Sequence, residues 1–136
     1  MLKNKKGFTL VELLAVIVIL AIILAIAVPG ISGIINSAKK GSFESDVKMI
    51  VTGIEYKLLE STVTGTAAPD VDVAAITTVE GLAELANYGA DPTNYTSFQI
   101  TSMSPVTISL TSASTSEFGA WATTGATKSS VTATAQ

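Results

Sequence analysis

An apolar segment near the start of the chain constrains its structure more than any other feature. From Phe8 to Val28, only Thr9 and Glu12 are polar among 21 residues. A helix of this length spans about 30 Å, the thickness of the hydrocarbon core of a membrane. Lysines at positions 3, 5 and 6 precede the segment, and none lies inside it. The positive-inside rule therefore predicts a cytoplasmic N-terminus and an exported C-terminal part.

Three interpretations of this segment compete. In the first, it is an ordinary secretory signal with Ala25-Ile26-Ala27 as the cleavage site. In the second, it is a plain membrane anchor. In the third, the chain is cut before the apolar segment, which then stays with the mature protein.

Glu12 distinguishes these interpretations. A carboxylate inside an apolar membrane span costs about 2.5–3.5 kcal/mol on insertion scales, so it is rare without a partner. Cleavage between Gly7 and Phe8 would free an α-amino group that is largely protonated near neutral pH. Phe8 and Glu12 lie one helical turn apart, so this cation can pair with a carboxylate of its own or a neighbouring chain. Since the other two interpretations supply no such partner, Glu12 favours the third.

The segment KKGFTLVELL, residues 5–14, resembles the signal of type IV prepilins. The resemblance implies that a dedicated peptidase cuts after Gly7 and methylates the new N-terminal Phe8. It also implies that Glu12 pairs with the N-terminus of an adjacent subunit during assembly. Pro29 lies where many pilins carry a proline within their N-terminal helix. The similarity extends over about residues 5–60.

This resemblance implies a structural role with neither catalysis nor a cofactor. The expected function is that of a major pilin, the subunit of a helical homo-oligomeric filament of the kind used in adhesion, twitching motility or secretion. Its expected partners are the prepilin peptidase, an inner-membrane assembly platform with its ATPase, and the membrane before assembly. The expected location is the cytoplasmic membrane as a single-pass precursor, and afterwards the extracellular pilus on the cell surface.

Two alternatives remain open. One is a minor pilin or a pseudopilin of a type II secretion or competence DNA-uptake machine, and the other is an extracellular binding domain on a membrane anchor. The chain departs from the calcium-binding pseudopilins because Glu117 is the sole carboxylate after Asp91. It departs from many Gram-negative pilins because it has no cysteine to close a C-terminal loop. A Gram-positive pilin fits both departures.

The apolar pattern continues beyond the membrane-length segment. Apolar residues recur at three- and four-residue steps between Ile31 and Leu58, with charged residues between them. We therefore expect one helix over about residues 9–60. Pro29, Gly30 and Gly33 weaken its middle, where we expect a kink or local melting. The alternative is that Pro29 ends one helix and a second begins near Ser32.

The remaining sequence predicts a small head. Pro69-Asp70 is typical of a helical turn, and Thr78–Asn87 of a short helix that buries Val79, Leu82, Leu85 and Ala86. Alternating residues around 98–100, 106–110 and 131–135, with Phe118 and Trp121, predict three or four antiparallel strands, and residues 111–117 and 123–130 are expected to be loops. The expected fold is α+β: a leader (1–7), a protruding apolar helix (8–30), its amphipathic half (31–60) and a β-sheet head (61–136), together a pilin lollipop.

The composition excludes several kinds of site. Without histidine or cysteine, the chain cannot build the common catalytic triads, thiol nucleophiles or zinc sites, and no metal site is expected. Beyond residue 7, five lysines face eleven carboxylates, a formal charge of about −6 that disfavours nucleic-acid binding. The pairs Glu44/Asp46 and Asp70/Asp72 are interpreted as solvated surface. The sequon Asn94-Tyr95-Thr96 is expected to remain unmodified.

Overall fold

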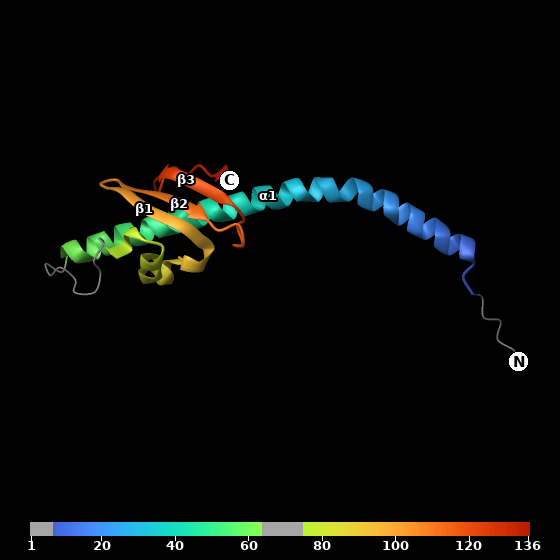
Figure 1. Cartoon of the computed structure of the whole chain (residues 1–136), viewed down its shortest axis with the longest axis horizontal. Coiled ribbons are helices and arrows are strands. Elements are labelled where there is room, and N and C mark those ends of the chain that lie inside the picture. Colours follow the sequence, from blue (N-terminus) through green and yellow to red (C-terminus); the bar gives the residue numbers. More distant parts are fainter. Residues whose placement is uncertain (1–6, 64–74) are drawn as a thin grey trace, which may run out of the picture. The chain divides into compact units, whose positions relative to one another are not determined.

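A 54-residue α-helix, α1 (Leu10–Val63), is the longest element of the computed structural model, which describes residues 7–63 and 75–136 (Figure 1). Pro29 lies inside this helix. The prediction of one continuous helix is confirmed, and the alternative of a helix ending at Pro29 is wrong. The chain divides into two compact units, Met1–Ser37 and Ala38–Gln136.

The part of α1 in the first unit is apolar on all sides and exposed. Its side chains from Leu10 to Ile35 include long runs of exposed leucine, isoleucine and valine. By length and composition, α1 contains a stretch able to cross a membrane, and none of that stretch is buried. A helix that is hydrophobic all round requires lipid or other protein around it. The first unit therefore provides a surface that needs a partner.

In the second unit, one face of α1 forms part of a hydrophobic core. Its buried residues recur at helical spacing, which places them on the side that faces the sheet: Phe43, Asp46, Val47, Ile50, Val51, Gly53 and Ile54. The core is completed by residues of the sheet and of the short helical turns, such as Ile108, Leu110 and Leu82. This packing gives the second unit its α+β fold, as predicted.

The sheet is an antiparallel meander with the strand order β1-β2-β3-β4 (Figure 1). The strands are β1 (Tyr95–Met103), β2 (Val106–Ser112), β3 (Trp121–Ala126) and β4 (Thr134–Ala135). On β2, Val106, Ile108, Leu110 and Ser112 are buried, whereas the threonines and serine between them are half-exposed. This two-residue alternation is what places one face of the sheet on the core.

Two predicted loops are partly strand. Residues 111–112 extend β2 and residues 123–126 belong to β3, because Thr111 pairs with Ala122 and Leu110 pairs with Thr123. Their Ser/Thr-rich sequence is typical of loops, but threonine is β-branched and suits a strand whose neighbours supply hydrogen bonds. The neighbouring strand, rather than the local sequence, therefore determined the structure here.

The predicted helix over Thr78–Asn87 is the 3₁₀-helix η2 (Glu80–Tyr88), which ends at Gly89 with φ 87°. Leu82 and Leu85 are buried as predicted and Val79 is half-buried, but Ala86 is exposed, which corrects the prediction. With three residues per turn, positions 79, 82 and 85 share one face and position 86 does not. Two shorter 3₁₀ turns are η1 (Ala75–Thr77) and η3 (Pro92–Asn94). The turn predicted at Pro69-Asp70 lies outside the described residues.

Hydrogen bonds hold the connection between β2 and β3 in a chain that has no cysteine. The buried hydroxyl of Ser112 accepts a hydrogen bond from the backbone N–H of Trp121 at 2.9 Å. The indole Nε1 of Trp121 donates to the carbonyl of Phe118 at 3.0 Å. The ring of Phe118 packs edge-on against Phe43 of α1 and stacks on Tyr95 of β1. Hydrogen bonds and ring packing thus stabilise this connection without a disulfide.

The C-terminal segment is tied to α1 by two acidic side chains. Glu44 accepts a hydrogen bond from the backbone N–H of Ala133 at 3.1 Å. It also forms an ion pair with Lys40, whose Nζ lies 3.8 Å from Oε1 of Glu44. Glu55 forms an ion pair with Lys128 at 3.3 Å. Glu44 and Glu55 thus link the C-terminal part of the chain to the helix.

Candidate functional site at the start of helix α1

The first turn of α1 is a capping box formed by Thr9 and Glu12. The backbone N–H and the hydroxyl of Thr9 both donate to Oε2 of Glu12, at 3.0 and 2.9 Å. The hydroxyl of Thr9 in turn accepts the backbone N–H of Glu12 at 3.3 Å. This reciprocal arrangement satisfies N–H groups that a helix N-terminus otherwise leaves unpaired. It explains why the helix begins at Leu10.

The capping box corrects one premise of the sequence analysis. From the sequence alone, Glu12 is expected to lack a partner unless the chain is cleaved. Here Glu12 accepts two hydrogen bonds from Thr9 in the uncleaved chain. The premise was wrong because it considered only charged partners. The signal that was overlooked is the spacing T-x-x-E from Thr9 to Glu12, which is typical of a capping box.

The peptide bond between Gly7 and Phe8 lies before the helix, in exposed non-helical chain. A Cβ atom at Gly7 would have nothing within 4 Å, and Phe8 is 89% exposed. Lys3, Lys5 and Lys6 lie outside the described residues. Phe8 and Glu12 line one shallow hollow of about 530 Å³ together with Leu13, Ala15 and Val16. The structure thus brings a carboxylate next to the residue that cleavage after Gly7 would make N-terminal.

The helix remains α-helical through Pro29 and Gly30. Proline has no N–H, so the carbonyl four residues earlier loses its backbone donor. Side chains supply additional hydrogen bonds nearby: the hydroxyl of Ser32 donates to the carbonyl of Val28 at 3.1 Å, and Ser37 donates to Gly33 at 3.1 Å. Such hydrogen bonds from a serine hydroxyl to the carbonyl of the preceding turn often accompany a bend in a helix. The segment is thus helical although it concentrates residues of weak helix propensity.

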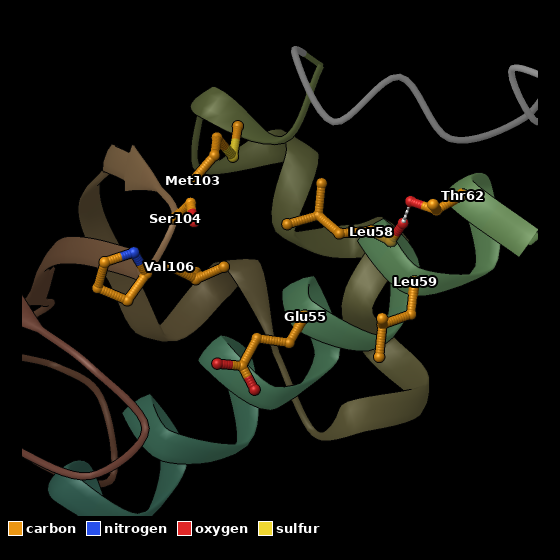
Figure 2. A pocket seen from close by; sticks show the side chains of 8 residues that line it. Glu55, Leu58, Leu59, Thr62, Met103, Ser104 and Val106 are labelled. Atoms are coloured by element: carbon orange, nitrogen blue, oxygen red, sulfur yellow. Dashed lines mark hydrogen bonds between the residues drawn. The ribbon is translucent and has the colours of Figure 1, made fainter.

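A groove in the second unit is an alternative candidate site. It measures about 310 Å³ and is lined by the last turns of α1 and by the β1–β2 hairpin (Figure 2). Its one carboxylate, Glu55, is paired with Lys128, and the hydroxyl of Thr62 is bonded to the carbonyl of Leu58. Within residues 7–63 and 75–136, no three acidic side chains are arranged to hold a metal ion. The groove contains no acid–base pair that could carry out catalysis.

Asp46 departs from the sequence interpretation of solvated surface. Its side chain is buried, with the residue 7% exposed, and its Oδ2 has no hydrogen-bond partner among the described residues. Burial, followed by the negative charges of Glu117 and Asp91, raises the pKa of Asp46 to about 6. Periodicity could have shown this, since Asp46 lies three residues after Phe43 on the face that packs on the sheet. The pair Asp70/Asp72 lies outside the described residues.

Comparison with known proteins concerns the site at the start of α1. Residues 2–28 match the family model described as "Prokaryotic N-terminal methylation motif", and the match includes Gly7, Phe8, Thr9 and Glu12. No curated protein and no solved structure matched the chain. The motif is that of structural pilin-like subunits rather than of an enzyme family. The protein therefore carries the type IV prepilin signature in residues 2–28.

Proposed function

We propose that this protein is the structural subunit, a major pilin, of a type IV pilus-like extracellular filament. The observation that carries the proposal is the methylation motif at residues 2–28, which lies on a helix whose apolar side chains are exposed on all sides. A soluble protein does not leave such a surface in water. Lipid covers it before assembly, and the helices of other copies of the chain cover it afterwards.

Processing between Gly7 and Phe8 prepares the subunit to exchange its lipid contacts for contacts with other copies of the chain. The cut removes the basic leader and leaves a positive α-amino group at Phe8, next to Glu12. In the precursor, Glu12 is bound by the neutral donors of Thr9. An ammonium group forms a stronger, charge-assisted hydrogen bond to a carboxylate, and the apolar surroundings strengthen it further. The Phe8 amine of an adjacent subunit is therefore the partner that Glu12 takes in the filament.

The remaining partners follow from this pathway. A prepilin peptidase cleaves after Gly7 and methylates Phe8, and a membrane assembly platform with its ATPase extracts the subunit from lipid. The precursor spans the cytoplasmic membrane once with its second unit outside, and the assembled subunit lies in the surface filament. The support for this pathway is the same motif together with a membrane-length apolar helix.

The mature chain should begin at Phe8 and carry one N-terminal methyl group. We expect mechanical shearing of the producing cells to release filaments in which this chain is the most abundant protein. Intact-mass analysis of the sheared fraction measures the start and the methylation together. A chain that starts at Val28 would support the secretory signal and refute the proposal. A correctly processed chain that is scarce in filaments built from another pilin would support the minor pilin or pseudopilin instead.

Replacing Pro29 with alanine should stiffen α1 and alter filament yield or stability. We propose that the segment around Pro29, Gly30 and Gly33, helical in the free subunit, partly unwinds when the helices pack in the filament, because weak helix propensity is concentrated there. A filament map that resolves the backbone checks the unwinding directly. Unbroken α-helical hydrogen bonding from Leu24 to Ile35 in that map would contradict it. The fold of the second unit, measured by Trp121 fluorescence, should be the same in both chains.

A further inference from the structure

One oxygen of a buried carboxylate in the second unit has no hydrogen-bond partner in the described part of the chain. Asp46 lies on the buried face of α1 between Phe43 and Val47, and its Oδ2 has no hydrogen-bond partner among the described residues. Its Oδ1 lies 3.8 Å from the position that a Cβ atom would occupy on Gly89. The side chain therefore points from α1 toward the corner that follows η2.

Two other elements bring negative charges toward Asp46. Asp91 follows the Gly89 corner and caps η3, and Glu117 lies in the connection between β2 and β3. Both repel a negative charge on Asp46. The ion pairs in the described part of the chain are Lys40–Glu44 and Lys128–Glu55, and neither involves Asp46. Burying an unpaired charge among like charges is unfavourable, so neutral Asp46 suits this position better than its anion.

We propose that Asp46, Asp91 and Glu117 form a proton-operated latch in the second unit. When Asp46 is protonated, the Gly89–Asp91 corner and the β2–β3 connection pack firmly against α1. When Asp46 is ionised, repulsion from Asp91 and Glu117 loosens both elements. The latch tightens on mild acidification and relaxes at neutral pH, which makes the rigidity of this unit respond to the medium around the cell.

The direction in which stability changes with pH follows from the pKa of Asp46 in the folded and unfolded states. The pKa of Asp46 is raised to about 6 in the fold, compared with an ordinary value of 3.8. The folded state thus holds the proton more strongly, and stability increases as the pH falls from 7 through 6 toward 4. Hydrogen bonds from Thr93 lower the pKa of Asp91, so Asp91 remains ionised and repelling throughout this window.

Unfolding of the full chain in detergent micelles at pH 7.5 and pH 5 tests the latch. Trp121, the sole tryptophan, reports on the β2–β3 region. We expect the unfolding equilibrium constant of the wild type to fall about tenfold at pH 5, which is one unit below the pKa of about 6 in the folded state. Asp46→Asn should remove most of this response and be more stable than wild type at pH 7.5. Glu84→Gln, a change at an exposed carboxylate of η2, should keep the full response.

Two measurements make the test independent of how well Asp46→Asn folds. Glu117→Gln removes one repelling charge outside α1 and should reduce the pH response without abolishing it. Amide exchange of wild type, corrected for the intrinsic effect of pH, should show greater protection of residues 89–91 and 113–120 at pH 5. An equal pH response in wild type and Asp46→Asn would overturn the proposal. So would a carbon-13 titration that places the Asp46 carboxyl at its ordinary pKa.

Discussion

Glu12→Val cells should form no surface filaments, although their precursor inserts into the membrane as well as wild type does. Insertion should not suffer, because valine enters an apolar span more readily than a carboxylate does. Assembly should fail because the Phe8 amine of each incoming subunit loses its partner in surroundings where an unpaired charge costs several kcal/mol. Membrane fractionation measures the first result, and the yield of sheared filaments measures the second.

Two further variants separate the pairing role of Glu12 from its capping role. Glu12→Gln can still accept hydrogen bonds from Thr9, since glutamine also serves in a capping box, but it carries no charge. It should assemble as poorly as Glu12→Val. Thr9→Val removes the capping hydroxyl and keeps the carboxylate, so it should still form filaments. Normal filament yield from Glu12→Val would refute the assembly role. Loss of filaments in Thr9→Val together with normal yield from Glu12→Gln would assign the effect to capping.

The same substitution at two glycines of α1 should have opposite effects on stability. A Cβ atom at Gly53 would lie 2.8 Å from Cγ and 2.9 Å from Cδ2 of Tyr88. These atoms belong to the base of a ring that also contacts Tyr56, so the ring has little freedom to move away. Overpacking lowers the free energy of unfolding by about 1–3 kcal/mol. The better helix propensity of alanine offsets about 1 kcal/mol of this loss. Gly53→Ala should therefore lower the free energy of unfolding.

Gly41→Ala is the matched control. A Cβ atom at Gly41 would meet nothing within 4 Å, so this change should raise the free energy of unfolding by about 0.5–1 kcal/mol. Denaturant unfolding of the full chain in detergent, followed by Trp121 fluorescence, compares the two variants. The double variant Gly53→Ala/Tyr88→Ala should be more stable than the sum of its single changes predicts. Equal stability of the Gly53 and Gly41 variants would show that the ring of Tyr88 does not constrain this position.

The latch at Asp46 and the contact at Gly53 share a feature that explains why sequence reasoning missed both. Each residue lies on α1, yet its significance comes from chain that is far away in sequence. Asp46 lies near Gly89 and is repelled by Asp91 and Glu117, and Gly53 faces the ring of Tyr88. Local composition made Asp46 look like one more solvated carboxylate. The contacts that contradict this interpretation span more than 30 residues of chain.

Much of the architecture was nevertheless predictable from the sequence. The apolar run from Phe8 to Val28, the K-K-G-F-T-L-V-E pattern and the three- and four-residue steps beyond Ile31 each depend on neighbours within one or two helical turns. Local patterns of this kind correctly predicted a continuous α1 and the prepilin signature. The strict alternation over residues 106–110 likewise predicted β2, because side chains of a strand alternate between its two faces.

Only the tertiary structure decided the rest. Residues 123–126 are strand because β2 provides hydrogen-bond partners, and Ser112 closes the β2–β3 connection because Trp121 lies beside it. The negative charges that help raise the pKa of Asp46 come from Glu117 and Asp91, which are far from it in sequence. Periodicity in a sequence reports which face of an element is apolar, whereas the partner of each polar group is known only once distant segments have been brought together.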